Sequence, residues 1–454
     1  MSRLMVSVSG VRGEIGRTLT PEIAAQFGSA FGTMLGAGAT VVVGRDSRPS
    51  GPMIRSAVIS GLLACGVRAI DLGLVTTPGA ALMTGELKAD GGVVITASHN
   101  PLPWNGIKFL RPTGLGLSVE AAARLKQIWE SRDYAYVDPA RCGTETTNDS
   151  THATHVGKVL SIVDVKAIAR RRFKVVLDSV NGAGGVGTAM LLKKLGCELI
   201  PMNAEPTGLF AHTPEPTEAN LTDLCAEVAR CGAAVGFAQD PDADRLALVD
   251  EHGTYIGEEY TLALCAAYVL GGRTGSAAAN LSTSRMIDDI AARHGGTVFR
   301  TPVGEANVAG RMLEEGCIIG GEGNGGIIDP RVVPVRDSMA GMALVLAYLT
   351  ATGRTLGELV GDIPRYAMIK AKFPCPADAA PKVAAAARKQ YAGRKGAAFN
   401  DSDGLRIDLP SGWVHVRASN TEPIMRIIAE APARDAAEAL VEEVRQIAEP
   451  FVKG

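Results

Sequence analysis

The chain has 454 residues, 46% of them hydrophobic, and its 46 Lys+Arg and 48 Asp+Glu leave a formal net charge of −2. This length and apolar content predict several domains, each with a core of its own. The balanced charge gives no reason to expect a nucleic acid or an anionic membrane as a partner.

The sequence also lacks features of a membrane or secreted protein. No stretch reaches the roughly 20 apolar residues that span a bilayer, and the first residues are too quickly polar for a signal peptide. The eight cysteines are scattered and form no C-x-x-C pair. We therefore expect free thiols and a cytoplasmic protein.

Apolar strands alternate with helical stretches in the first part of the chain, which is typical of βαβ units. Residues 39–43 predict a strand that leads to Arg45 and Arg48. Residues 90–95 predict a buried strand, and the polar loop that follows contains Ser98 and ends at a proline. Ser98 is thus expected at the carboxyl end of a strand, where open α/β sheets bind ligands. A turn without chemistry is the alternative.

Two further cations lie on loops of this region. Arg12 is flanked by glycines near the start of the chain, and Lys108 follows the serine loop. Residues 143–155 are rich in Thr, Asn and Ser and predict a polar linker, after which the strand–helix alternation restarts.

The alternation occurs in three successive regions and then gives way to another pattern. Three alternating strands with tight turns and a terminal helix predict an antiparallel α+β unit at the C-terminal end. We therefore expect three related α/β domains followed by a different one. The predicted boundaries are 1–150, 151–256, 257–365 and 366–454.

Three aspartates alternate on the loop that follows the predicted strand 233–237, namely Asp240, Asp242 and Asp244. A solvated acidic loop is one interpretation. A calcium-binding EF-hand is excluded, because the position that needs glycine for a sharp turn is Arg245 and the next residues resemble a strand. The other interpretation is a site for a hard cation such as Mg²⁺, with coordination positions left for water or a phosphoryl oxygen.

Such a site needs positive neighbours to act on a phosphoryl group. Arg12, Arg45, Arg48, Lys108 and Arg245 all lie on loops at predicted strand ends, although each one alone is commonly a surface residue. Ser98 is then a candidate nucleophile or phosphate carrier. A serine hydroxyl needs activation by a base or a metal, and a metal at the aspartates is the more economical arrangement.

Two later loops carry groups suited to a sugar phosphate. The run from Arg417 to Thr421 offers an arginine, two hydroxyls and an amide, which suit a phosphate monoester. Glu322 and Asn324 lie among glycines and offer a carboxylate and an amide for sugar hydroxyls, with an ordinary glycine-rich turn as the alternative. No Walker A or Rossmann fingerprint implies a nucleotide.

Four motifs occur in an order that resembles the α-D-phosphohexomutase superfamily. They are Thr96-Ala-Ser98-His99-Asn100-Pro101, Asp240-Pro-Asp242-Ala-Asp244-Arg245, the Glu322 loop and Arg417-Ala-Ser419-Asn420-Thr421-Glu422-Pro423. The resemblance covers essentially the whole chain. It implies an α/β fold of four domains around a central cleft, with three related mixed-sheet domains and a C-terminal antiparallel α+β domain. Each domain would contribute one loop, and the C-terminal domain would move to open and close the cleft.

The resemblance also implies a reaction, the interconversion of hexose 1-phosphate and 6-phosphate through a phosphoserine and a hexose 1,6-bisphosphate, which also acts as activator. Ser98 would be the phosphoserine, with Arg12 and Lys108 as candidates for acid/base assistance and charge stabilisation. The ligands of Mg²⁺ would be the phosphate of Ser98 together with Asp240, Asp242 and Asp244.

The remaining motif residues would bind the substrate. Glu322 and Asn324 would contact sugar hydroxyls, and Arg245 would contribute positive charge. The residues that would hold the non-reacting phosphate are Arg417, Ser419, Asn420 and Thr421. The expected partner is a small sugar phosphate, bound by a monomer or homodimer.

The sugar loop departs from the family pattern. Many relatives have Ser-Gly-His there, whereas this chain has Asn324-Gly325-Gly326. The preference among glucose, mannose and glucosamine phosphates is therefore left open. Two other functions also remain as alternatives: a sugar-phosphate phosphatase that hydrolyses the same phosphoserine, and a sugar-phosphate binder without catalysis.

Overall fold

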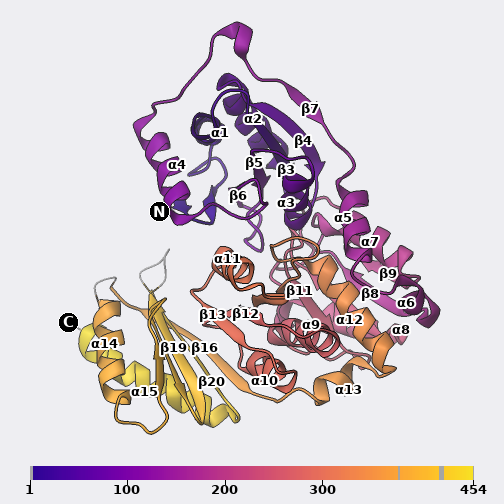
Figure 1. Ribbon diagram of the computed structural model, residues 1–454, viewed down its shortest axis with the longest axis vertical. Coiled ribbons are helices and arrows are strands. Elements are labelled where there is room, and N and C mark those ends of the chain that lie inside the picture. The colour runs from indigo at the N-terminus through magenta and orange to yellow at the C-terminus, as the bar shows by residue number, and fades with distance from the viewer. Residues whose placement is uncertain (1–3, 377–378, 419–423, 453–454) are drawn as a thin grey trace. The chain divides into compact units, whose positions relative to one another are not determined.

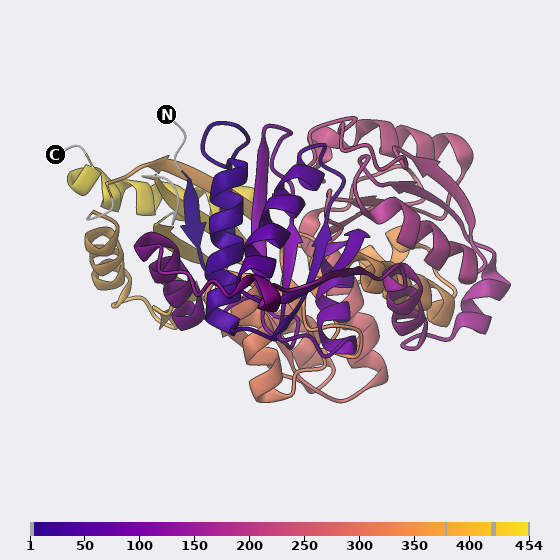
Figure 2. The ribbon, with the colours of Figure 1, turned by 90° about the horizontal axis from the view of Figure 1, so that it is seen from above.

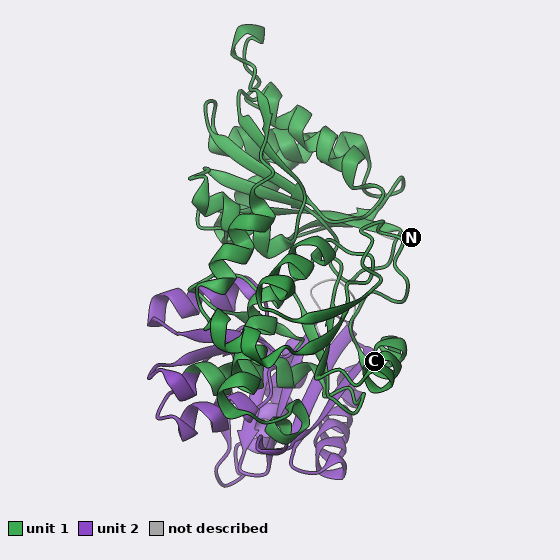
Figure 3. Cartoon of the chain, turned by 90° about the vertical axis from the view of Figure 1, so that its right-hand side faces the viewer, with its two compact units in different colours: residues 1–269, 324–360 green, residues 270–323, 361–454 purple. Residues whose placement is uncertain are grey.

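The computed structural model describes residues 4–376, 379–418 and 424–452, which form four β-sheets with helices packed on them (Figure 1). Contacts divide the chain into two compact units, which Figure 3 shows in different colours. Unit 1 comprises Met1–Val269 and Asn324–Val360, and unit 2 comprises Leu270–Gly323 and Gly361–Gly454. Among the helices of the described residues, none has both the length and the apolar character needed to cross a bilayer.

The first sheet of unit 1 has seven strands in the order β1-β2-β6-β5-β3-β4-β7. Strands β3, β4, β5 and β7 are parallel to one another, whereas β1, β2 and β6 join by antiparallel pairing, so the sheet is mixed. The strands are β1 (Met5–Ser7), β2 (Gly10–Glu14), β3 (Thr40–Arg45), β4 (Arg68–Leu74), β5 (Gly91–Ile95), β6 (Trp104–Leu110) and β7 (Glu145–Thr147). The helices are α1 (Pro21–Leu35), α2 (Gly51–Ala64), α3 (Thr77–Glu86) and α4 (Val119–Ser131).

Helices α1 and α2 lie side by side on this sheet, as Figure 2 shows in indigo. Their apolar side chains, including Phe27 and Ile54, form one core with Val43 and Ile95 of the strands. Every residue of β5 is buried, because helices cover both of its faces. Since β3 and β5 are parallel, the loops that follow them emerge at the same edge of the sheet. That edge carries Ser98.

The second sheet of unit 1 has the order β11-β10-β8-β9, and only β11 is antiparallel to its neighbour. Its strands are β8 (Lys174–Asp178), β9 (Glu198–Met202), β10 (Val235–Gln239) and β11 (Leu246–Val249). The helices of this region are α5 (Thr151–Leu160), α6 (Val165–Arg171), α7 (Gly184–Lys194) and α8 (Thr222–Cys231). Unit 1 also contains β15 (Gly326–Ile328) and α12 (Ser338–Thr352), while α9 (Glu258–Gly272) and α13 (Leu356–Gly361) lead into unit 2.

The polar linker predicted over residues 143–155 is wrong. Residues 145–147 form β7, the edge strand of the first sheet, and α5 begins at Thr151. The three side chains of β7 are exposed, so the strand shows no apolar alternation. Only its backbone pairing with β4 makes it a strand, and sequence pattern does not reveal such pairing.

Unit 2 contains two sheets that differ in kind. The strands β12 (Ala277–Asn280), β13 (Val298–Thr301) and β14 (Ile319–Glu322) are parallel, with α10 (Met286–Arg293) and α11 (Glu305–Glu315) between them. The other sheet is antiparallel throughout, in the order β16-β20-β19-β18-β17. Its strands are β16 (Ala367–Pro374), β17 (Ala398–Asn400), β18 (Leu405–Leu409), β19 (Gly412–Ala418) and β20 (Ile424–Ala431), with helices α14 (Ala379–Tyr391) and α15 (Arg434–Val452).

The predicted fold class is confirmed: three mixed α/β domains precede an antiparallel α+β domain. The three strands predicted in the last domain correspond to β18, β19 and β20. Alternating burial along them, for instance in β20, reflects one face packed on helices and one face toward solvent.

A buried histidine joins the two parts of unit 2. His415 of β19 approaches the carbonyl oxygen of Asp403 with Nε2 at 2.7 Å and the hydroxyl of Ser282 with Nδ1 at 2.9 Å. Because a carbonyl only accepts, Nε2 carries the proton and Nδ1 accepts from Ser282. The neutral ring therefore satisfies both of its nitrogens. Burial lowers the pKa of His415 to about 4.

We expect this histidine to make unit 2 less stable in acid. In the unfolded chain, His415 is protonated as the pH falls below about 6.5. In the folded protein, the same ring is protonated only as the pH falls to about 4. The stabilisation is therefore complete above pH 6.5 and is lost as the pH falls, by about 3 kcal/mol in total. Urea unfolding at successive pH values, followed by the fluorescence of the buried Trp413, measures this loss. His415→Gln should remove that part of the pH dependence. Identical stability-against-pH profiles for the variant and the unchanged protein would contradict the assignment of this effect to His415.

Candidate active site

Ser98 lies on the loop between β5 and β6, and the loop holds it in an unusual conformation. Its φ angle is 49°, in the left-handed region that non-glycine residues seldom adopt. The Ser98 amide donates to the hydroxyl of Thr96 at 2.9 Å, and the Ser98 hydroxyl donates to Asp240 Oδ2 at 2.7 Å. The ring of His99 is farther away, with 3.4 Å between Ser98 Oγ and Nδ1. The closest partner of the serine is thus a carboxylate.

Arg48 binds the backbone of the loop that carries Ser98, the serine loop between β5 and β6. Its side chain is fully buried, Nε donates to Asp46, and the two terminal nitrogens donate to four backbone carbonyls. These carbonyls belong to Ser98, Asn100, Pro101 and Trp104, at 2.6–3.0 Å. All five N–H groups of the guanidinium are therefore used. The expectation that Arg48 offers positive charge to a phosphoryl group is corrected: its donors already hold the loop that carries Ser98 in place.

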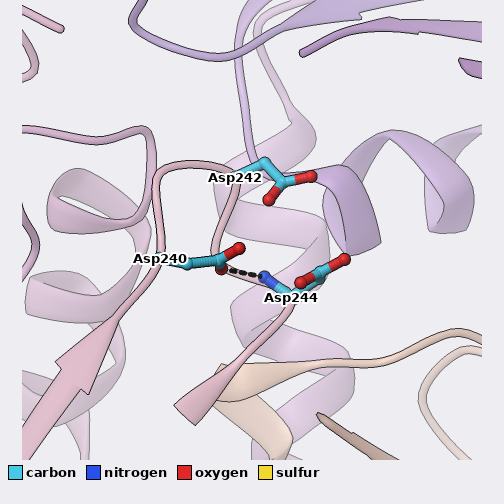
Figure 4. A group of neighbouring side chains, drawn as sticks. All are labelled: Asp240, Asp242 and Asp244. Atoms are coloured by element: carbon cyan, nitrogen blue, oxygen red, sulfur yellow. Dashed lines mark hydrogen bonds between the residues drawn. The ribbon is translucent and has the colours of Figure 1, made fainter. Parts of the chain in front are cut away.

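The three aspartates lie on the loop between β10 and β11 (Figure 4). All three are buried. A carboxylate oxygen from each lies within 4.8 Å of the others. Asp240 Oδ1 accepts from the backbone amides of Asp244 and Arg245, each at 3.1 Å, which fixes the loop. Ala243, between two of the aspartates, has a φ angle of 57°. The tight loop turns the alternating carboxylates toward one point.

Three side chains from other elements of unit 1 bind this cluster. Lys108 Nζ lies 2.7 Å from Asp242 Oδ2 and 3.6 Å from Asp244 Oδ2. The hydroxyl of Thr77, at the start of α3, donates to Asp242 Oδ2 at 2.7 Å. Arg336 donates to Asp244 Oδ2 at 2.5 Å. The first and second sheets of unit 1 thus meet at the aspartates.

The cluster divides its charge unevenly. Burial and the neighbouring carboxylates raise the pKa of Asp240 well above its usual value. Burial alone would also raise the pKa values of Asp242 and Asp244, but nearby cations outweigh it and hold both low: Lys108 beside Asp242, and Arg336 beside Asp244. The cluster therefore favours two ionised carboxylates and resists a third negative charge unless another cation binds.

The donor set fits a divalent cation with hard oxygen preference. Asp242 Oδ1 and Asp244 Oδ1 are buried and accept no hydrogen bond from the described residues. Unpaired buried carboxylate oxygens are costly, and a bound cation would satisfy them. Asp240 and the Ser98 oxygen lie beside them. Oxygen donors alone, with neither thiol nor imidazole, suit Mg²⁺.

Arg12 and Arg245 lie close to the cluster, and each contacts a polar side chain. Arg12 donates to Asn100 Oδ1 at 2.9 Å, and Arg245 pairs with Glu215 Oε1 at 3.3 Å. Burial lowers the pKa of Arg12, although a guanidinium stays charged. Burial and the charges of both arginines lower the pKa of His99 to about 3. The surroundings of Ser98 therefore contain fixed cations and a neutral histidine.

The predicted substrate-binding residues are divided between the units. Asn324 belongs to unit 1, and its Oδ1 accepts from the amide of Gly326 at 3.2 Å. In unit 2, Glu322 Oε1 accepts from Asn280 Nδ2 at 2.7 Å and from the Gly304 amide at 3.1 Å. Arg417, also in unit 2, pairs with Asp403 at 3.2 Å. The other three residues of the predicted phosphate loop, Ser419, Asn420 and Thr421, lie outside the described residues.

Three residues of the site do not follow from the sequence motifs. Thr77 opens a helix after β4, Glu215 lies in a long loop rich in proline, and Arg336 precedes the capping residue of α12. Only Thr77 carries a usable signal, because it lies just beyond the carboxyl end of a parallel strand. The other two belong to no recognisable pattern.

Comparisons with known proteins agree with this architecture along the whole chain. Models of the phosphoglucomutase/phosphomannomutase family match α/β/α domain I at residues 3–135, domain II at 152–253, domain III at 258–366 and the C-terminal domain at 368–447. A phosphoglucomutase/phosphomannomutase of Thermococcus kodakarensis is 41% identical over 98% of both chains. A probable phosphoglucosamine mutase of Methanopyrus kandleri is 39% identical over 96% of this chain and 95% of its own length. The crystal structure of a phosphoglucomutase/phosphomannomutase family protein from Burkholderia thailandensis has a TM-score of 0.87 at 28% identity, covering 99% of both chains. The chain belongs to the phosphoglucomutase/phosphomannomutase family.

Proposed function

We propose that this protein is a Mg²⁺-dependent phosphohexomutase that interconverts hexose 1-phosphate and hexose 6-phosphate through phosphorylated Ser98. One observation carries the proposal: the Ser98 hydroxyl donates at 2.7 Å to a buried cluster of three carboxylates. The cluster is flanked by Lys108, at 2.7 Å from Asp242. A serine, a hard-cation site and fixed positive charges are the groups that phosphoryl transfer through a phosphoserine requires.

The reaction would run in two balanced halves. A sugar hydroxyl attacks the phosphorus of phospho-Ser98, the bond from phosphorus to Ser98 Oγ breaks, and the hydroxyl proton ends on the serine oxygen. The product of this half is a hexose 1,6-bisphosphate. After the sugar turns end for end, Ser98 Oγ attacks its other phosphorus and passes its proton to the sugar oxygen that leaves. Enzyme without phosphate enters the cycle by taking a phosphoryl group from added bisphosphate, which is therefore the activator.

The residues of unit 1 would serve the reacting phosphoryl group. Asp240 orients the serine oxygen, and Lys108 and Arg12 offer charge and donors to the transferred group. Bound Mg²⁺, held by the aspartates and a Ser98 phosphate oxygen, would withdraw charge from that phosphate. Arg245 would add positive charge next to the same group.

The residues of unit 2 and Asn324 would bind the rest of the substrate. Glu322, whose carboxylate is oriented by two hydrogen bonds, and Asn324 would contact sugar hydroxyls. The non-reacting phosphate would be held by Arg417, Ser419, Asn420 and Thr421. Glucose, mannose and glucosamine phosphates are the candidate substrates, and the relatives carry names that correspond to all three sugars.

A ³¹P NMR time course tests the function and ranks the sugars. The enzyme, Mg²⁺ and a trace of glucose 1,6-bisphosphate would be offered glucose 1-phosphate, mannose 1-phosphate and glucosamine 1-phosphate in parallel. We expect a 6-phosphate signal to grow for at least one sugar and to stay absent without Mg²⁺. Inorganic phosphate released in step with substrate loss would instead show the phosphatase. No new signal with any sugar would contradict catalysis altogether.

A further inference from the structure

Gly326 and Arg336 occupy the same space beside the carboxylate cluster. A Cβ atom built on Gly326 would lie 2.1 Å from Arg336 Cδ and 2.9 Å from Arg336 Cγ. No side chain fits there while the arginine keeps its place. The side chain that fills this space belongs to residue 336.

The backbone holds Arg336 in this place. The amide of the next residue, Asp337, donates to the carbonyl oxygen of Ile327 in β15 at 2.8 Å. The Asp337 side chain caps α12 and also accepts from the buried His155 at 2.8 Å. These bonds of Asp337 therefore fix the backbone next to Arg336.

The guanidinium of Arg336 ends at a carboxylate of the cluster. It donates to Asp244 Oδ2 at 2.5 Å, the same oxygen that Lys108 Nζ approaches to 3.6 Å. The Arg336 side chain is only 12% exposed, so solvent screens this charge weakly. Asp244 has further support, because its amide donates to Asp240 Oδ1. Loss of the arginine would therefore remove a charge without releasing the loop.

We propose that Arg336 is a positioning residue that acts through Asp244 and sets the charge balance of the cluster between metal and phosphate. This inference rests on the proposed function and deepens it. The fixed positive charge competes with Mg²⁺ for Asp244, so it weakens metal binding. The same charge attracts phosphoryl oxygens, so it strengthens binding of a phosphorylated sugar. A residue with a purely structural role would affect both ligands in the same direction or neither.

Titration calorimetry in a Ser98→Ala background tests this without turnover, since that chain accepts no phosphoryl group. The two probes are Mg²⁺ alone and glucose 1,6-bisphosphate. Arg336→Gln should bind Mg²⁺ at least roughly tenfold more tightly and the bisphosphate at least roughly tenfold more weakly, because the removed charge lies close to both ligands. Arg336→Lys keeps the charge and should change either affinity by less than about threefold.

Two more variants separate the charge from the fold. Gly326→Ala should displace the Arg336 side chain, shift both affinities in the directions seen for Arg336→Gln, and add little when the two changes are combined. Arg331→Gln is the matched control, because Arg331 lies in the same loop but pairs with Asp329. It should leave both affinities unchanged. Weaker binding of both probes by Arg336→Gln, or no change in either, would overturn the inference. A failed mutase assay leaves these titrations interpretable.

Discussion

Ser98→Ala should reduce mutase activity by at least about 10⁴-fold, since the change removes the proposed phosphate carrier. The change removes one oxygen, and its main structural loss is the hydrogen bond to Asp240 at 2.7 Å. The fold should therefore survive, and the melting temperature should stay close to that of the unchanged protein. Activity is measured with the sugar that the NMR experiment identifies.

Intact mass supplies a second measurement for the same variant. The unchanged protein should gain a phosphate adduct when mixed with glucose 1,6-bisphosphate, and Ser98→Ala should gain none. Ser50→Ala is the control, because Ser50 also lies at a strand-to-helix loop but bonds to Asn105. It should keep nearly full activity and accept the phosphate. A phosphate adduct or substantial turnover in Ser98→Ala would refute Ser98 as carrier.

Arg48→Met should lower the free energy of unfolding by about 3–5 kcal/mol, the usual cost of breaking a buried ion pair from one side. Asp46 would remain buried, and burial already raises its pKa even with Arg48 present. Four carbonyls of the serine loop would lose their donors in addition. Urea unfolding followed by circular dichroism measures the loss, and kcat should fall with it because the loop positions Ser98.

Two variants make this prediction sharper. Arg48→Lys keeps the charge beside Asp46 but supplies fewer donors than the carbonyls require, so it should recover only part of the stability. Arg45→Met is the matched control, because Arg45 is a partly exposed arginine on the same segment whose bond is to the Asp46 carbonyl at 3.1 Å. It should cost less than about 1 kcal/mol. Equal losses for Arg45→Met and Arg48→Met would show that Arg48 has no special part in the loop.

The sequence determined the fold class, because local patterns repeat along it. Strand β5 is an uninterrupted apolar run that ends in a polar loop, and that transition locates Ser98 at the edge of a parallel sheet. The loop with Asp240, Asp242 and Asp244 is equally local. Arg245 at the position where an EF-hand needs glycine excludes that motif, and the three alternating carboxylates suit a hard cation before any tertiary contact is known. The change from βαβ alternation to three paired strands likewise marked the C-terminal domain.

Only the tertiary structure decided which cations face the site. Arg12, Arg45, Arg48, Lys108 and Arg245 look alike in sequence, since the pattern predicts a loop at a strand end for each. The structure instead places Arg12 in β2, Lys108 in β6 and Arg45 at the last position of β3. Contacts with residues at least 50 positions away then distinguish Arg48 from Lys108. The guanidinium of Arg48 donates to the backbone of the loop that carries Ser98, whereas Lys108 binds Asp242, 134 positions further along the chain. Burial and hydrogen bonding depend on what the rest of the fold brings near, and no local pattern encodes that.

Arg336 and β7 are features that sequence patterns did not indicate at all. Arg336 belongs to no motif and lies 92 positions from Asp244, yet the chain's return through β15 and α12 brings them together. β7 has exposed side chains and becomes a strand only through its backbone partner. Sequence therefore determined the chemistry that each loop can supply. The tertiary structure decided which of these groups meet, because long-range packing sets distance, burial and charge.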